Sequence, residues 1–149
     1  MIIGSISENK DIEKRISITP EIAKKYINLG FELSLPENYA LHIGINDSEF
    51  KKLGVNIIKD EIELITSSDV IIQLGLLSED KLSLIKENQI YIGILNPYKN
   101  KEKLEDLKKK NINLFSLELL PRITRAQSMD ILSSQANLAG YKAVVEAFA

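Results

Sequence analysis

The stretch between residues 121 and 137 is the most chemically distinctive part of this 149-residue sequence. It contains the cationic donor Arg122, the amide Gln127, the carboxylate Asp130 and the hydroxyl Ser133. If the stretch is helical, at about 100° per residue, Gln127 and Asp130 share one polar face and Ser133 lies roughly 40° outside it. This set of donors and acceptors suits recognition of a neutral polar group, such as a carboxamide or a ribose, better than proton abstraction.

The same residues also have a purely structural interpretation. Thr124 and Gln127 have the spacing of a capping box, in which the Gln127 side chain closes the N-terminus of a helix. Asp130 in the first turn would complement the positive end of the helix dipole. The residues alone therefore leave a functional and a structural interpretation open.

The elements that must position this stretch alternate between short apolar runs and helical patterns. Strands are predicted at 2–6, 31–35, 55–58, 69–73, 90–95 and 112–116. Helices are predicted at 21–29, 47–53, 61–66, 78–86, 101–110 and 126–148. Runs such as DVIIQ and YIGIL are apolar throughout, as in strands covered on both faces. The alternation predicts an α/β fold, a flavodoxin-like three-layer sandwich with a mostly parallel sheet.

Local residues mark where some of these helices begin and end. Thr19 and Pro20 are typical of an N-cap and a first helical position, and Gly30 is typical of a helix C-terminus. The last predicted helix differs from the others because, at about 23 residues, it would be roughly 34 Å long. We therefore predict a flavodoxin-like domain over 1–125 and a long interdomain helix over 126–149.

Composition excludes several other classes of site. The sequence has no cysteine and a formal net charge of −2, and no stretch has metal-ligand spacing. Its seven glycines form no glycine-rich phosphate-binding turn. No apolar run approaches the ~20 residues of a membrane span. His42, the only histidine, has no base or nucleophile near it in sequence, so a structural role is expected.

The polar stretch also carries a family resemblance. PRITRAQSMDILSSQANLAGYKAVVEA closely resembles the corresponding stretch of the alpha subunit of proton-translocating NAD(P) transhydrogenase. IGSISENKDIEKRISITPE, SDVIIQLGLLSED and LNPYKN extend the resemblance over essentially the whole chain. Outside 121–146 the similarity is shared more loosely with alanine dehydrogenase and related enzymes.

The resemblance implies a reaction and roles for particular residues. In the transhydrogenase, hydride passes directly between NADH and NADP bound to different components, coupled to proton translocation. Arg122 and Asp130 would hold the nicotinamide end of NAD(H), and Ser133 would bind its carboxamide. Gln127 would reach toward the NADP-carrying component. Positioning is the principal demand, because direct hydride transfer needs neither an acid nor a base.

The resemblance also implies what lies around this chain. The expected partners are the NADP-binding and membrane components, with a homodimer of the full subunit. The expected location is cytoplasmic, peripheral to the inner (plasma) membrane. A Rossmann domain with a glycine-rich fingerprint is expected beyond residue 149, so the fragment should be inactive alone, need no metal and bind NADH very weakly.

Two alternatives remain at this stage. The first is a fragment of an alanine-dehydrogenase-like amino-acid dehydrogenase, a family that uses a lysine and a histidine on its substrate. The matching residues here are Gln73 and Asn96, which cannot form a charged proton-shuttling pair. Arg15 matches an arginine common to both families, and a structural role fits it at least as well. The second alternative is a stand-alone α/β module whose long helix binds a partner.

Overall fold

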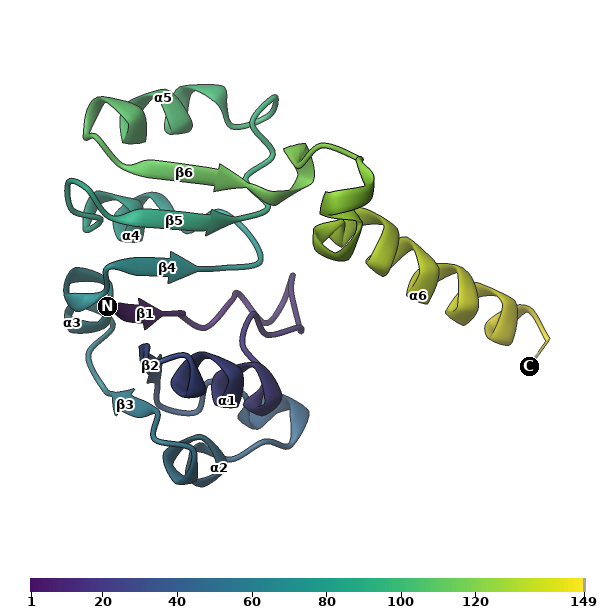
Figure 1. The fold of residues 1–149 in the computed structure, drawn as a ribbon, viewed down its shortest axis with the longest axis horizontal. Helices are drawn as coiled ribbons and strands as arrows, with labels where there is room; N and C mark the ends of the chain where they lie inside the picture. Colours follow the sequence, from purple (N-terminus) through teal and green to yellow (C-terminus); the bar gives the residue numbers. More distant parts are fainter. Residues whose placement is uncertain (149) are drawn as a thin grey trace.

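The computed structural model describes residues 1–148, which contain one six-stranded parallel sheet (Figure 1). Its strands are β1 (Ile2–Gly4), β2 (Glu32–Pro36), β3 (Asn56–Ile58), β4 (Val70–Ile72), β5 (Ile90–Gly93) and β6 (Asn113–Ser116). They lie in the order β3-β2-β1-β4-β5-β6, and every neighbouring pair is parallel. The predicted α/β fold is thereby confirmed. The order is that of the doubly wound dinucleotide-binding sheet rather than the 2-1-3-4-5 order of flavodoxin itself.

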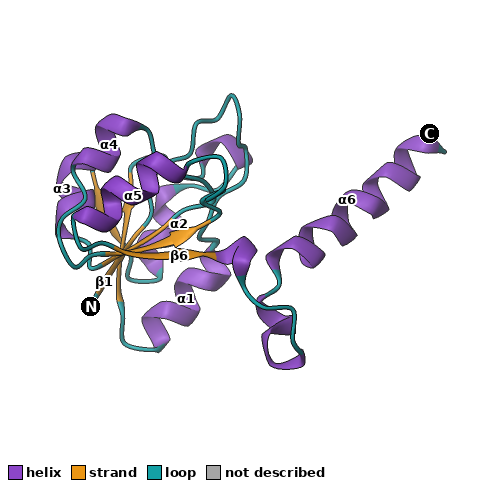
Figure 2. Cartoon of the chain, turned by 90° about the horizontal axis from the view of Figure 1, so that it is seen from above, coloured by secondary structure: helices purple, strands orange, loops and turns teal. Residues whose placement is uncertain are grey.

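Helices cover both faces of the sheet. Helices α1 (Pro20–Asn28) and α2 (Asp47–Lys52) pack on one face of β1, β2 and β3. Helices α3 (Glu61–Ser67), α4 (Glu79–Ser83) and α5 (Lys101–Lys109) pack on the other face. Seen from above, α1 lies on one side of the sheet and α3, α4 and α5 lie on the other (Figure 2). This is the arrangement that right-handed crossovers produce when the chain reverses its direction of travel across the sheet.

Each face of the sheet has its own apolar core. On the α1 side, Phe50 of α2 is fully buried and its ring meets that of Tyr39 edge-to-face at 6.0 Å. On the α4 side, Ile71 and Tyr91 pack with Leu64 of α3. Fully burying one such side chain contributes about 1.5–3 kcal/mol. Residues 1–119, which include both cores and the short 3₁₀ helices η1 (Leu41–Ile43) and η2 (Leu117–Leu119), are called the body below.

The local predictions for α1 are confirmed. The Thr19 hydroxyl accepts from the backbone N–H of Ile22 at 3.4 Å, and Pro20 is the first helical residue. Gly30 follows the helix with φ = +85°, a conformation that glycine adopts without steric cost. The helix therefore begins and ends where its sequence predicts.

The predicted helix over 126–148 is shorter and begins later. Thr124–Met129 forms the 3₁₀ helix η3, and the long helix, α6, is Ile131–Ala147. The reason is Asp130, which is extended (φ −75°, ψ 91°) and whose carboxylate accepts from the backbone N–H of Ser133 at 3.0 Å. Asp130 is therefore the N-cap of α6, and the capping-box interpretation of Thr124 and Gln127 is wrong.

Helix α6 projects away from the body (Figure 1). Residue 149, the end of the predicted interdomain helix, lies outside the described residues. The division into a domain and an interdomain helix stays a prediction. Among residues 1–148, no helix is both long and apolar enough to cross a membrane.

Candidate functional site

The sheet topology creates a cleft between β1 and β4. The chain leaves β1 toward β2 and leaves β4 toward β5, so the loops after these two neighbouring strands separate. Doubly wound folds place ligands at this switch point, beyond the carboxyl ends of the strands. Here the loops enclose a cleft of about 540 Å³, whose lining includes Glu8, Arg15, Gly75, Lys81 and Asn96.

Glu8 closes the bottom of this cleft. Its Oε1 accepts from the backbone N–H of Leu74 at 2.7 Å and from Nε2 of Gln73 at 3.3 Å. Burial raises the pKa of the Glu8 carboxyl above its ordinary value of 4.5, against the opposing effect of the Leu74 backbone hydrogen bond. Glu8 therefore ties the loop after β1 to the end of β4.

Gln73 and Asn96 are held by the scaffold. The Gln73 side chain is buried, and its Oε1 accepts from the backbone N–H of Ile6 at 2.7 Å and from Oγ of Ser5 at 3.0 Å. Asn96 is left-handed (φ +48°), and its backbone N–H donates to the carboxylate of Glu118. Neither side chain can take up and release a proton near neutral pH, so this cleft holds no lysine–histidine pair.

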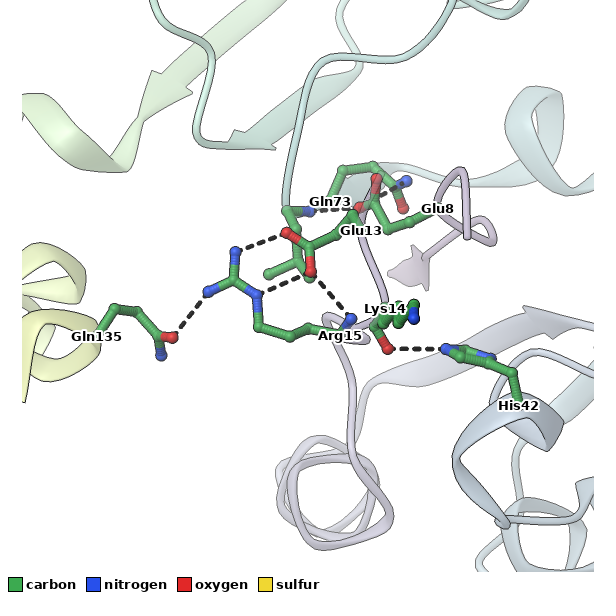
Figure 3. Close-up of polar contacts among 8 residues, drawn as sticks. Glu8, Glu13, Lys14, Arg15, His42, Gln73 and Gln135 are labelled. Atoms are coloured by element: carbon green, nitrogen blue, oxygen red, sulfur yellow. Dashed lines mark hydrogen bonds and ion pairs between the residues drawn. The ribbon is translucent and has the colours of Figure 1, made fainter. Parts of the chain in front are cut away.

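Arg15 is fully engaged by protein groups. Its Nε and Nη2 donate to the two carboxylate oxygens of Glu13, at 2.8 and 2.6 Å, and its Nη1 donates to Oε1 of Gln135 at 2.7 Å (Figure 3). The hydrogen bonds between Glu13 and Arg15 lower the pKa of Glu13 and raise that of Arg15. A bidentate pair of this kind neutralises the guanidinium, which leaves little charge for a substrate carboxylate.

The predicted site residues lie at the junction of the body and α6. Asp130 accepts from both the backbone N–H and Oγ of Ser133, the latter at 2.6 Å. These hydrogen bonds, with a smaller contribution from the charge of Arg122, lower the pKa of the Asp130 carboxyl. Gln127 is exposed on η3, outside α6. The structure thus joins Asp130 to Ser133, brings Arg122 within electrostatic range, and puts Gln127 on a separate turn.

Sequence reasoning singled out Arg15 but not the residues that hold it. Glu13 lies two positions away, whereas Gln135 is 120 residues away. Glu8 was likewise missed, since its partners follow a different strand. These contacts depend on the strand order and on the direction of α6, for which no local motif exists.

The junction can bind a carboxamide but not a whole dinucleotide. The ionised Asp130 can accept from an amide N–H, and the Ser133 hydroxyl can both donate and accept. Arg122 is a further fixed donor. A pyrophosphate needs a glycine-rich turn at a helix N-terminus, which this sequence lacks. The residues therefore fit the nicotinamide end of NAD(H) alone.

A doubly wound parallel sheet with a polar cleft at its switch point defines the class, a dehydrogenase-type α/β domain. The chain belongs to the family described as "Alanine dehydrogenase/PNT, N-terminal domain", whose profile matches residues 4–139. The family thus covers nearly all of the body and the first half of α6.

Relatives on both sides of this family align with the chain. The first of the polypeptides that make up the NAD(P) transhydrogenase alpha subunit of Rickettsia prowazekii is 39% identical, over 99% of this chain and 39% of its own length. "Alanine dehydrogenase 1" of Staphylococcus aureus is 23% identical over 97% of this chain and 38% of its own length. The chain thus spans about two fifths of these relatives.

A solved structure agrees with the first of these relatives. The transhydrogenase from Sinorhizobium meliloti superposes with a TM-score of 0.90 and 36% identity, over 98% of this chain and 43% of the solved one. The match extends through α6, because only 2% of the chain is left uncovered.

Proposed function

We propose that this chain is the N-terminal portion of the NAD(H)-binding component of a proton-translocating NAD(P) transhydrogenase. The observation that carries the proposal is the pair of Gln73 and Asn96 in scaffold positions, beside an Arg15 already neutralised by Glu13. The cleft therefore offers no acid–base pair for an amino acid. What the chain offers is a polar junction that can orient a nicotinamide ring.

Three residues have the main roles in this proposal. Asp130 stays ionised because Ser133 hydrogen-bonds to it, so it accepts from the carboxamide N–H. Ser133 holds the carboxamide through its hydroxyl, and Arg122 keeps the nicotinamide end of NAD(H) against the junction. The nicotinamide supplies and accepts the hydride. The protein groups orient the ring and need not move a proton.

Gln127 has a different role, which follows from its position. It is exposed on η3, on the side of the junction where another protein can approach. In the proposal it contacts the NADP(H)-carrying component. The other expected partners are the membrane component and a second copy of the full subunit, with the chain at the cytoplasmic side of the membrane.

The adenosine and pyrophosphate are assigned to a Rossmann domain beyond this chain. Because the junction holds only one end of the dinucleotide, the isolated chain should bind NADH weakly. Calorimetric titration of the chain with NADH measures this directly, and a micromolar Kd would contradict the proposal. Turnover of pyruvate, ammonia and NADH by the full-length protein would favour the amino-acid dehydrogenase instead.

The decisive test is Asp130→Asn in the assembled transhydrogenase that carries this sequence. The change keeps the shape of the side chain and removes its charge. We expect hydride transfer to fall by roughly 10²-fold, as when one preorganised polar partner is removed at a reacting centre. NADH affinity of the component should change by less than about 10-fold, or 1.4 kcal/mol, because the second domain supplies most of it.

The matched control is Asp106→Asn on α5, an exposed carboxylate paired only with Lys109. It should leave both transfer and NADH affinity unchanged. Equal losses of binding and transfer in Asp130→Asn would mean uniform binding rather than orientation of the ring. Gln127→Asn should slow transfer in the complex while leaving NADH binding by the separate component intact.

A further inference from the structure

Helix α6 is fastened to the body by a single side-chain hydrogen bond. Nη1 of Arg15 donates to Oε1 of Gln135 at 2.7 Å, and among residues 1–148 no other hydrogen bond joins α6 to the body. The remaining contact of α6 with the body is against η2. Gln135 lies near the start of α6, within two turns of Asp130 and Ser133.

Arg15 is itself held in place from the other side. Glu13 grips its guanidinium through two parallel N–H···O bonds, and Oε1 of Glu13 also accepts from the backbone N–H of Arg15 at 2.9 Å. A fork-to-fork pair fixes the plane of the guanidinium as well as its distance. The remaining Nη1 therefore points in one direction, toward Gln135 (Figure 3).

The loop that carries Arg15 is anchored at several points. Nε2 of His42 hydrogen-bonds to the carbonyl of Lys14 at 2.8 Å (Figure 3). The buried hydroxyl of Tyr39 accepts from the backbone N–H groups of Ser17 and Ile18, at 3.1 and 3.2 Å. With Glu8 tied to the end of β4, the loop is fixed to the body before, at and after Arg15.

We infer that Arg15 is a positioning residue that sets the direction of α6, and with it the placement of Asp130 and Ser133. The inference deepens the proposed function, on which its catalytic consequence rests. Arg15 is not assigned a contact with NAD(H). It acts through Gln135, because rotating or tilting α6 moves the residues at its N-terminus. A misplacement of about 1 Å at a reacting centre can cost about 10²-fold in rate.

The direction of α6 can be measured without any cofactor. The sequence has no cysteine, so Lys24→Cys on α1 and Ala143→Cys on α6, both exposed, take spin labels for a pulsed dipolar distance measurement. With Arg15 and Gln135 present we expect one narrow distance distribution. Gln135→Leu should broaden it and shift its mean. Gln135→Glu, which keeps an acceptor for Nη1, should restore it.

Three further variants complete the experiment. Arg15→Met keeps the apolar stem and should reproduce the effect of Gln135→Leu. The double variant should add nothing to either, because both remove the same interaction. Glu146→Gln removes a polar partner within α6, the ion pair with Lys142, and should leave the distribution unchanged. Circular dichroism establishes that each variant is folded.

The functional arm uses the assembled transhydrogenase. There Gln135→Leu should slow hydride transfer by roughly 10- to 100-fold, with Gln135→Glu restoring it. An unchanged distance distribution in both Gln135→Leu and Arg15→Met overturns the inference, whatever happens to transfer. A changed distribution with unaffected transfer upholds the positioning of α6 by Arg15 and contradicts the proposed function of the junction.

Discussion

The body and α6 differ in where they put their apolar side chains. In the body, Phe50 and Tyr91 are completely buried, and α1 directs its apolar residues toward the sheet. In α6 no residue is buried, and apolar side chains such as Leu138 and Val144 are 61% and 58% exposed. The apolar residues of α6 are spread around the helix without a preferred face. A helix of that kind is stable when other protein surrounds it.

This difference separates rigidity from recognition. The body has complete cores on both faces and a firmly anchored loop after β1, but its cleft holds no acid–base pair. The residues proposed to bind nicotinamide lie where the body ends, and Asp130 caps the very helix that is least buried. The body thus supplies a fixed support, and α6 supplies recognition groups whose placement depends on that support.

The largest test of this contrast compares two phenylalanines. Phe50→Ala should lower the free energy of unfolding by about 3–5 kcal/mol, because it empties a fully buried position against Tyr39. Phe148→Ala should change it by less than about 0.5 kcal/mol, since that ring is exposed at the end of α6. Urea denaturation of the 149-residue chain, followed by circular dichroism, measures both.

A large effect of Phe148→Ala would erase the contrast. It would mean that α6 is covered in solution, most simply by a second copy of the chain. The unfolding midpoint would then rise with protein concentration, which a two-state monomer does not allow.

Residues of local meaning predicted the body well. Thr19 and Pro20 begin α1 and Gly30 ends it, as their types require, and the apolar runs became parallel strands. The junction was harder, because both Thr124 and Asp130 are good N-cap residues. The cap is Asp130, whose carboxylate reaches two groups of Ser133 at once. Contacts between distant residues, such as that of Arg15 with Gln135, could not be predicted before the strand order was known.

A smaller effect is expected from two glutamines of equal size. Gln73→Leu should destabilise the chain by about 1–3 kcal/mol, because the backbone N–H of Ile6 loses its buried acceptor. Gln127→Leu, at an exposed position on η3, should be nearly neutral in the same urea experiment. Comparable losses in the two variants would show that water reaches Ile6 and replaces the lost acceptor.

The smallest effect is the opposite titration of two carboxylates. Burial raises the pKa of Glu8 above 4.5, whereas hydrogen bonds from Ser133 lower the pKa of Asp130 below 3.8. The stabilising contribution of Glu8 is therefore fully present below its unfolded pKa and is lost as pH rises through its higher folded pKa. That of Asp130 is present above its unfolded pKa and is lost as pH falls through its lower folded pKa.

Carboxyl carbon NMR of the chain, with Glu8→Gln and Asp130→Asn to assign the two resonances, measures both pKa values. If Glu8 titrates at or below 4.5, water enters the cleft and the loop after β1 is not closed over Glu8. If Asp130 titrates at or above 3.8, Ser133 does not hold the cap, and the N-terminus of α6 frays in solution. In that case Asp130 would be presented to a ligand by a mobile turn, and Arg15 could not position it through Gln135.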